Sequence, residues 1–430
     1  MRLKRSRSFR PFTHQLLVCA IVGFAAAPSQ AADPNESWSR FRGKNGAGIA
    51  ETCSVPIPWS SSDVAWSIGL PGGGNGSPVV RGNQVFVQSA DPKTAARSVM
   101  CLDLASGDLL WKRDSQGQPH RVHRRSSFAS PTPCVGGNAV YVVWGQPDKI
   151  TVASYSLDGK TENWTRDLGR FQSQHGYGAS PALFGDILVL FNSQQGEQLR
   201  GGQRPGKSSV IALNASSGKT IWQTDLTTRR VCYGVPTLYE TAEGKPALLF
   251  ANTGDGLFAL DLASGDSLWS KQVFEKRCVS SPQVVAGLAI GTEGSGGGGN
   301  RLFAVELEGD HDVKFRITRN APYVPTPVVK GNLLFLWDDN GVASCVELPS
   351  GKLLWSERAS DGPVSSSPVI AGDKLLGISE SGSLVVIAAG SEYEKLGSVD
   401  LQDLTRATPV VGESYLLVRT NSRLMCIGKP

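Results

Sequence analysis

Residues 259–269 read Ala-Leu-Asp-Leu-Ala-Ser-Gly-Asp-Ser-Leu-Trp. In this stretch an apolar strand ends at Asp261, whose carboxylate can accept backbone N–H groups of a turn, and Gly265 then supplies a positive φ. The returning strand carries Trp269, a flat side chain that suits the wedge between two neighbouring sheets. Close copies of this frame occupy residues 101–111, 212–222 and 345–355. The frame therefore predicts a β-hairpin that is repeated along the chain.

Each frame is accompanied by a second motif, in which a small residue and then usually Ser, Thr or Pro precede a proline that opens a β-branched run. Eight such prolines occur at intervals of 41 to 55 residues: Pro78, Pro131, Pro181, Pro236, Pro282, Pro327, Pro368 and Pro409. A period of this length that carries only short strand signals is typical of one four-stranded propeller blade. The sequence therefore predicts an all-β fold, an eight-bladed β-propeller of four-stranded antiparallel blades.

The two ends of the repeat array predict how the ring closes. Residues 64–68 carry Trp66 and resemble the last strand of a blade, yet they stand before the first proline unit. The final unit, residues 408–427, has three strand-like runs and no tryptophan strand. We therefore expect Trp66 to complete the eighth blade, so that residues 64–430 form one closed propeller without an open sheet edge.

The chain before the propeller divides into two predicted segments. Residues 1–31 have a basic beginning, a twelve-residue apolar core at 16–27 and a small-residue ending, which is the pattern of a signal peptide. Twelve residues are too few to span a bilayer as a helix, so we expect an exported protein, periplasmic or extracellular, that is not transmembrane. Residues 32–63 are expected to form an extended segment that packs the aromatic pair Trp38 and Phe41 on the propeller.

The charge balance argues against polyanionic partners. The chain of 430 residues has 43 basic and 38 acidic residues, but residues 1–31 hold five of the basic residues and none of the acidic ones. The remainder is balanced at 38 of each, so no net charge favours nucleic acid or an anionic membrane surface. We expect a monomer with no nucleic-acid partner.

Cysteines occupy two kinds of position. Cys101, Cys345 and Cys426 share one place in the repeat, where other blades have alanine, so we interpret them as small core residues. Cys232 and Cys278 each stand four residues before a strand-opening proline, in neighbouring blades. A disulfide between them needs Cα atoms within about 7 Å. Two free thiols in equivalent slots are the alternative, and the sequence leaves both open.

No catalytic or metal site is predicted. The chain lacks G-x-S-x-G, Walker, H-E-x-x-H and C-x-x-C-H motifs, which are signatures of serine hydrolysis, nucleotide chemistry, zinc proteolysis and c-type haem. His120 and His123 have a metal-like spacing, but Arg121, Arg124 and Arg125 among them oppose a bound cation. We therefore assign no catalytic residue and no metal ligand.

The frame Ala-x-Asp-x-x-Ser-Gly-x-x-x-Trp, together with the proline opening, resembles the repeat of pyrroloquinoline-quinone-like propellers over residues 64–427. That family contains calcium-dependent quinoprotein alcohol dehydrogenases and a non-catalytic branch, which includes the scaffold lipoprotein of the bacterial outer-membrane assembly machine. The opening Trp-x-x-Phe-Arg-Gly-x-x-Gly-x-Gly of residues 38–48 is similar to that of secreted planctomycete propellers. The dehydrogenases carry a vicinal Cys-Cys disulfide and Glu/Asn calcium ligands, and none of these positions can be matched here. The resemblance therefore implies the non-catalytic branch, with no cofactor.

We expect the chain to act as a binding or scaffolding module of the cell envelope, which uses a disc face or the central mouth to engage a protein or peptide. One alternative is a quinone-dependent oxidoreductase with a divergent site that holds pyrroloquinoline quinone and calcium. Another is a polysaccharide-binding module in which Trp and Tyr side chains at the rim stack on sugars. Most tryptophans, however, are already assigned to the wedges between blades.

The repeat register points to one candidate binding surface. Six residues before the strand-opening proline, four consecutive blades carry a basic residue: Arg125, His175, Arg230 and Lys276. Two residues further along, the loops carry Tyr177 and Tyr323 in addition to the two cysteines. Because equivalent positions in a propeller lie on one circle, these residues would form a basic arc above an aromatic wall. Such an arc favours an anionic ligand, such as a carboxylate or an acidic peptide; solvated loops whose charges point apart are the alternative.

Overall fold

The structure is a computed structural model that describes residues 38–430. The predicted signal peptide and the beginning of the predicted segment 32–63 lie outside the described residues. The described part is built from strands, apart from the short 3-10 helices η2 (Lys44–Gly46) and η3 (Ser61–Asp63). Neither of these helices is long enough or apolar enough to cross a membrane.

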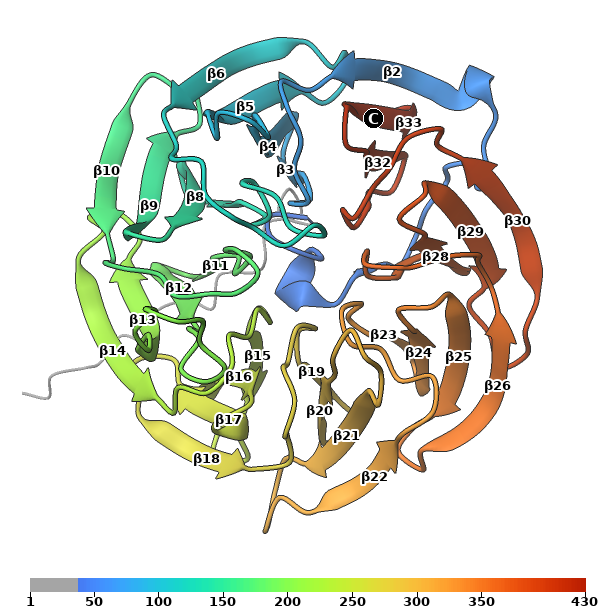
Figure 1. Cartoon of the computed structure of the whole chain (residues 1–430). Helices are drawn as coiled ribbons and strands as arrows, with labels where there is room; N and C mark the ends of the chain where they lie inside the picture. The colour runs from blue at the N-terminus through green and yellow to red at the C-terminus, as the bar shows by residue number, and fades with distance from the viewer. Residues whose placement is uncertain (1–37) are drawn as a thin grey trace, which may run out of the picture. The chain divides into compact units, whose positions relative to one another are not determined.

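Eight blades follow one another around a central axis, with the fourth strand of each blade at the circumference (Figure 1). Blades 1 and 2 comprise β3 (Val79–Arg81), β4 (Gln84–Ala90), β5 (Arg97–Asp103), β6 (Leu109–Ser115), β7 (Cys134–Gly136), β8 (Ala139–Gln146), β9 (Lys149–Ser156) and β10 (Glu162–Asp167). Blades 3 and 4 comprise β11 (Ala182–Phe184), β12 (Ile187–Asn192), β13 (Ser208–Asn214), β14 (Thr220–Leu226), β15 (Thr237–Glu240), β16 (Pro246–Asn252), β17 (Gly256–Asp261) and β18 (Ser267–Lys271).

The second half of the ring repeats the pattern. Blades 5 and 6 comprise β19 (Gln283–Val285), β20 (Leu288–Glu293), β21 (Arg301–Glu306), β22 (Val313–Ile317), β23 (Val328–Lys330), β24 (Leu333–Trp337), β25 (Val342–Glu347) and β26 (Lys352–Arg358). Blades 7 and 8 comprise β27 (Val369–Ala371), β28 (Lys374–Ile378), β29 (Ser383–Ala388), β30 (Lys395–Asp400), β31 (Val410–Val411), β32 (Tyr415–Arg419), β33 (Arg423–Gly428) and β2 (Val64–Gly69). The fold is therefore the predicted all-β, eight-bladed propeller.

Ring closure occurs as the sequence predicts. The strand β2 pairs with β33 in antiparallel register, with Trp66 opposite Cys426. Cys101 and Cys345 lie opposite Trp111 and Trp355 in the same way, and these cysteines are fully buried. The two ends of the propeller therefore share one sheet, which covers the edge that β33 would otherwise expose.

The predicted tryptophan wedges are present at the seams between blades. Trp111 of blade 1 packs against Gly159 in a turn of blade 2, and its indole N–H donates to the carbonyl of Leu157 at 2.7 Å. A Cβ at Gly159 would lie only 2.3 Å from the indole. Glycine at this turn therefore provides both a positive φ of 68° and the space for the ring.

The predicted register of blade 2 was wrong by two residues. The strand β7 begins directly after Pro133, just as β3 begins directly after Pro78, so Pro133 and not Pro131 opens this blade. The segment Pro-Thr-Pro offers two candidate prolines. Thr132 is in the hydroxyl position because its Oγ1 accepts the N–H of Ser77 from the preceding blade. Arg125 consequently lies eight residues, not six, before the opening proline.

Candidate functional site

The repeated Ser or Thr before each strand-opening proline builds a ring of hydrogen bonds around the channel. Ser77 N–H donates to Thr132 Oγ1 and Thr132 N–H donates to Ser180 Oγ, each at 2.9 Å. Equivalent bonds of 2.9–3.1 Å continue from Val235 N–H around the ring through Ser281, Thr326, Ser367 and Thr408 back to Ser77. Val235 has no hydroxyl to receive the N–H of Ser180, so the ring has one gap.

One end of the channel is closed by residues 38–50. The segment hydrogen-bonds to inner strands around the ring: Val80 of blade 1 donates to Trp38 O, Leu238 of blade 4 donates to Asn45 Oδ1, and Ile370 of blade 7 donates to Gly48 O. The ring of Phe41 lies at the bottom of the channel, beneath the hydroxyl ring. Figure 1 shows η2 at the centre of the blades. The predicted packing of Trp38 and Phe41 on the propeller is thus present, and it seals the channel.

Two buried arginines hold this closing segment in place. Arg40 donates to Pro236 O at 2.7 Å, and Arg42 donates to Pro327 O and Pro368 O at 2.8 and 2.6 Å. Burial lowers the pKa of Arg40 to about 10 and that of Arg42 to about 9. Both guanidinium groups remain charged at neutral pH and interact with backbone dipoles instead of carboxylates.

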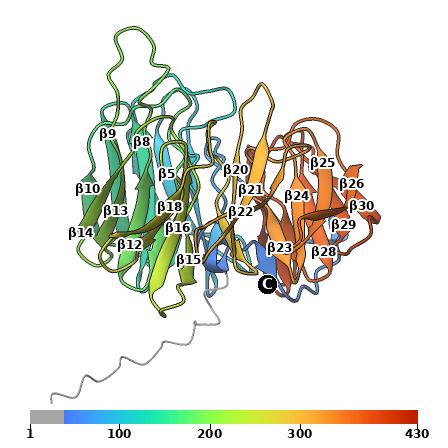
Figure 2. The same cartoon turned by 90° about the horizontal axis from the view of Figure 1, so that it is seen from below.

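The opposite end of the channel is open. Its mouth is a cavity of about 300 Å³, and the loops of Ser193–Ser209 and Ser295–Asn300 rise on this side of the ring (Figure 2). The side chains that matter for its chemistry are His123, Arg125, His175, Tyr177, Tyr233, Arg277, Tyr323 and Arg406. Because the channel is closed below, a ligand can enter the mouth from one face only.

Arg277 is the central cation of the mouth. Its side chain is 8% exposed, and Nε donates to Val231 O at 2.9 Å, which fixes the guanidinium. The two terminal nitrogens make only long contacts of 3.4 Å, with the hydroxyl of Tyr323 and with Gln195 Oε1. Among the described residues no carboxylate lies within ion-pair distance of Arg277. The guanidinium therefore presents to the cavity a charge that no carboxylate compensates.

The other two arginines of the mouth are compensated. Glu380 pairs with Arg125 at 3.2 Å and with Arg406 at 2.8 Å, and it accepts a hydrogen bond from Ser365. Burial alone would raise the pKa of Glu380, but these partners lower it below its usual value.

A second carboxylate near the mouth, Asp339, differs from Glu380. Burial raises the pKa of Asp339 to about 6, although it accepts the backbone N–H of Tyr323 at 2.6 Å.

Two histidines contribute polar but uncharged surface. The rings of His123 and His175 meet edge to face with centroids 5.1 Å apart. Burial, helped by Arg277 and His123, lowers the pKa of His175 to about 4, and burial with Arg124 and Arg125 lowers that of His123. His175 is therefore neutral at pH 7, and its buried Nε2 has no hydrogen-bond partner among the described residues.

The predicted basic arc is only partly assembled. Arg125, His175, Tyr177 and Tyr323 line the cavity. Lys276 does not, because its Nζ donates to Gly298 O and Gly299 O of the glycine-rich loop, and Arg230 is half-buried outside the cavity lining. The aromatic wall thus follows the repeat register, whereas the charges do not.

Four of the side chains that line the mouth were not among the predicted site residues. These are His123, Arg277, Arg406 and Tyr233. Tyr233 and Arg406 both stand three residues before a strand-opening proline, next to the position that holds Tyr177 and Tyr323 in other blades. The sequence thus contained a signal for these two, while the choice of Arg277 over Lys276 depends on loop conformation.

Cys232 and Cys278 lie side by side beneath the mouth as free, fully buried cysteines. The N–H of Cys278 points to Cys232 Sγ at 3.4 Å. Burial raises the pKa of Cys278, whereas hydrogen bonds from Cys278 and Thr253 outweigh burial and lower the pKa of Cys232. The disulfide between them stays a prediction.

The mouth does not offer a calcium–quinone site. The carboxylates nearest to it are committed elsewhere: Glu380 to two arginines, Glu293 to Arg301 and to the backbone N–H of Glu275, and Asp339 to the backbone N–H groups of Tyr323 and Val324. Residues 38–430 contain no cluster of three or more His, Cys, Asp and Glu side chains that could hold a metal ion. The donor set therefore does not fit calcium, and we derive no redox step through a quinone.

The fold and its repeat define a class, the propellers built from pyrroloquinoline-quinone-like repeats. The family model described as "Outer membrane protein assembly factor BamB" matches residues 57–142 and 206–429, and the chain belongs to that family. A relative from Yersinia pestis, "Outer membrane protein assembly factor BamB", is 22% identical over 347 residues, which cover 79% of this chain and 70% of that protein.

Solved structures show the same fold at low sequence identity. BamB from Moraxella catarrhalis superposes with a TM-score of 0.59 and 12% identity, over 85% of this chain and 99% of that one. The quinohemoprotein alcohol dehydrogenase from Comamonas testosteroni superposes with a TM-score of 0.64 and 13% identity, over 91% of this chain and 80% of that one. Since BamB and a quinohemoprotein alcohol dehydrogenase share the fold, function must be argued from the site.

Proposed function

We propose that this chain is an exported binding or scaffolding module of the cell envelope and that its channel mouth receives an anionic group of a protein or peptide partner. The observation that supports this most strongly is Arg277, a buried cation that faces the cavity without a carboxylate partner. A desolvated, uncompensated charge is costly unless an anion completes it. Its family relatives are named as assembly factors, which favours a protein partner.

The shape of the mouth limits how the partner binds. The closing segment 38–50 blocks the far end, so a polypeptide cannot thread through the ring. A cavity of about 300 Å³ accommodates one or two side chains or a chain end. The phenol groups of Tyr233 and Tyr323 add hydrogen-bonding edges and apolar faces beside the guanidinium. We therefore expect one carboxylate to insert while the rest of the partner contacts the disc face.

Binding of a simple acidic probe tests the proposal. A labelled peptide (Glu-Gly)₃ amide should bind the protein, whereas the isosteric (Gln-Gly)₃ amide should bind at least about tenfold more weakly. Arg277→Gln should reduce binding of the acidic probe about tenfold or more. Lys276→Gln is the matched control, because the adjacent cation is held by the glycine-rich loop outside the cavity, and its effect should stay within about twofold.

The same variants test whether the mouth binds a protein partner in the cell envelope. A photo-crosslinker placed at Ser126, on the rim of the mouth, should capture a protein partner, and the yield should fall in Arg277→Gln but not in Lys276→Gln. Equal loss in both variants, or equal affinity for the Glu and Gln probes, would show that the mouth is not the binding site.

A further inference from the structure

Most seams between blades are closed by one shared device. The indole N–H of the outer strand donates to a carbonyl in the turn of the next blade: Trp66 to Leu104 O, Trp111 to Leu157 O, Trp164 to Ala215 O and Trp222 to Leu262 O, at 2.7–3.0 Å. In each case the ring packs against the glycine of that turn. The device thus joins packing to a directional hydrogen bond.

A second donor commonly stands two residues after the tryptophan. Arg113 donates to Gly159 O at 2.7 Å, Arg166 to Gly218 O at 2.5 Å and Thr224 to Gly265 O at 2.6 Å. In these three seams the turn of the following blade therefore receives two side-chain hydrogen bonds. Side chains at both positions face across the seam.

The seam between blades 5 and 6 has neither donor. Phe315 replaces the tryptophan and packs against Gly351, and Ile317 stands at the second position. Neither side chain carries a hydrogen-bond donor. A phenyl ring also fills less space than an indole, so the seam is both less polar and less completely filled than its neighbours.

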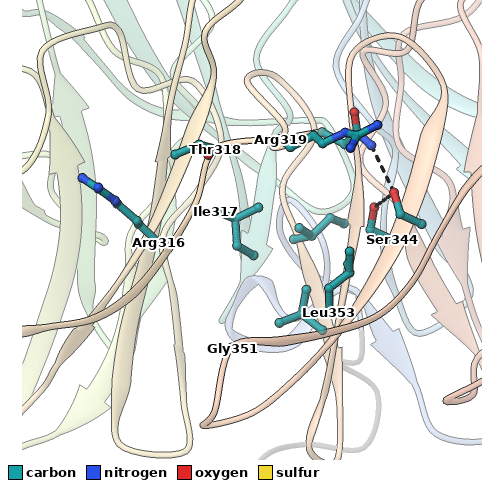
Figure 3. Close-up of a pocket in the computed structure, with 11 residues that line it drawn as sticks. Arg316, Ile317, Thr318, Arg319, Ser344, Gly351 and Leu353 are labelled. Atoms are coloured by element: carbon teal, nitrogen blue, oxygen red, sulfur yellow. Dashed lines mark hydrogen bonds between the residues drawn. The ribbon is translucent and has the colours of Figure 1, made fainter.

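A groove of about 430 Å³ opens at this seam, between β22 and β26 (Figure 3). Ile317 and Leu353 lie on opposite sides of it (Figure 3). The buried side chains of Leu336 and Val346 also line it. Leu353 is 56% exposed. One wall is polar, because Asn320 donates to Ser356 Oγ at 3.1 Å, and Ser356 bonds to Ser344.

The seam between blades 7 and 8 shows what fills such a gap in this molecule. Gly397 of β30 pairs with Val386 just beyond a register shift, the place that tryptophan holds in other blades. Pro58 covers it, since a Cβ at Gly397 would lie 2.8 Å from the proline ring. Val55 and Ile57 of the same extended segment are buried beside it. A segment from outside the blade therefore replaces the missing tryptophan.

We propose that the groove between β22 and β26 is a second docking site, for an extended segment of a partner protein that inserts an aromatic side chain flanked by carboxylates. The aromatic group would occupy the space left by the missing indole. The carboxylates are indicated by Arg319, which lines the groove, is exposed and has no ion pair within residues 38–430. The guanidinium of Arg316 is also exposed but points away from Ile317 and the groove (Figure 3). This site lies at the circumference, away from the channel mouth.

Three capped tripeptides test the occupant. Acetyl-Asp-Trp-Asp amide should bind with a dissociation constant of about 0.1–1 mM, an affinity suited to one anchor side chain. Acetyl-Asp-Ala-Asp amide lacks the aromatic group and acetyl-Lys-Trp-Lys amide reverses the charge; both should bind at least about fivefold more weakly. Equal binding of the three peptides to the protein would overturn the proposal.

Two leucine variants locate the site. Leu353→Arg should weaken binding of acetyl-Asp-Trp-Asp amide at least about fivefold. Leu109→Arg is the matched control, because Leu109 holds the same position in β6, two residues before a tryptophan, and is equally exposed at 54%. Its binding should stay within about twofold of wild type. Equal losses in both variants, or binding that survives Leu353→Arg, would overturn the assignment.

A refilled seam gives a third readout. The double variant Phe315→Trp with Ile317→Arg restores the chemistry of the closed seams, so it should raise the melting temperature or leave it unchanged while it lowers peptide binding at least about fivefold. If the wild-type protein dimerises and Leu353→Arg abolishes the dimer, the occupant of the groove is a second copy of this chain. That result would contradict a partner protein as the occupant. Loss of mouth binding in Arg277→Gln should leave this site unaffected.

Discussion

The two ends of the propeller channel use arginine in opposite ways. At the closed end, Arg42 donates to the carbonyls of Gly46, Ala47, Pro327 and Pro368, so every face of the guanidinium is occupied by protein. At the mouth, Arg277 is anchored through Nε alone, and its terminal nitrogens have only long contacts. Both are buried cations, but the hydrogen bonds of the Arg42 guanidinium are all satisfied within the fold, whereas those of Arg277 are not. The difference separates a structural arginine from a binding arginine.

The largest expected effect comes from removing the closed end entirely. Deletion of residues 32–68 takes away the closing segment and the strand β2, which leaves β33 as an open edge and exposes the channel. Open sheet edges template aggregation, so we expect an insoluble or unfolded product. Solubility, size-exclusion chromatography and thermal melting measure this, and a monomeric product with unchanged melting would contradict the role of β2 in closure.

The next effect distinguishes the two arginines by stability. Arg42→Gln should lower the free energy of unfolding by about 2–4 kcal/mol, since it leaves several buried carbonyls without a donor. Arg277→Gln should cost about 1 kcal/mol or less, because the residue it replaces makes a single short hydrogen bond. Urea denaturation followed by tryptophan fluorescence compares them. A larger loss in Arg277→Gln would assign this residue a structural role and weaken the proposed function.

A smaller effect tests how Glu380 neutralises the positive charges of Arg125 and Arg406 at the mouth. Glu380 neutralises Arg125 and Arg406, so Glu380→Gln should release two cations toward the cavity and raise the affinity for the (Glu-Gly)₃ probe about three- to tenfold. The gain should shrink in high salt. Glu357→Gln, an exposed substitution on β26, is the control and should change little. Unchanged affinity in Glu380→Gln would mean that these arginines point away from the bound anion.

The sequence predicted the fold well because its signals are tied to backbone geometry. A turn glycine such as Gly265, an opening proline and a wedge tryptophan each fix a local conformation, and their repetition fixes the ring. Even the closing strand could be predicted, because Trp66 stands before the first of the eight repeat units and the last unit lacks a tryptophan strand. The register of blade 2 could not, since Pro131 and Pro133 are both compatible with a strand start. Only the hydrogen bond to Thr132 from the neighbouring blade distinguishes them.

The site was less predictable for a physical reason. Tyr177, which is buried, and Tyr323, which is half-buried, follow the repeat because large rings must pack into the wall of the channel. Long basic side chains in loops are not bound by that constraint, so Lys276 turns to the carbonyls of the glycine-rich loop while Arg277 turns to the mouth. Neither the repeat period nor the amino-acid composition predicts which of these two side chains faces the mouth. The closing arginines were also missed, since nothing in the segment 38–48 shows that carbonyls of distant blades would surround them.

The smallest expected effect is a pH dependence of the mouth that originates from Asp339. Burial raises the pKa of this carboxyl to about 6, above the unfolded value of about 3.8. Its contribution to stability is therefore complete below about pH 3.8 and is lost as the pH rises through about 6. Asp339 holds the backbone of Tyr323 and Val324 at the mouth, so its protonation also removes a negative charge beside a bound anion. The affinity for (Glu-Gly)₃ should rise about two- to fivefold between pH 7 and pH 5.5.

The neighbouring titratable groups allow this origin to be isolated. Burial and four nearby arginines keep the pKa of His123 below its usual value, that of His175 is about 4, and Glu380 remains ionised because its own pKa is lowered. Between pH 7 and 5.5 two groups near the mouth take up a proton, namely Asp339 and the sulfur of Cys232, whose pKa is lowered to about 6, so the comparison is made in a Cys232→Ser background. In that background Asp339→Asn should bind the probe at pH 7 as tightly as its parent does at pH 5.5, and its affinity should be nearly flat across that range. A rise of the same size in Asp339→Asn would assign the effect to His123 instead, which His123→Gln would then abolish.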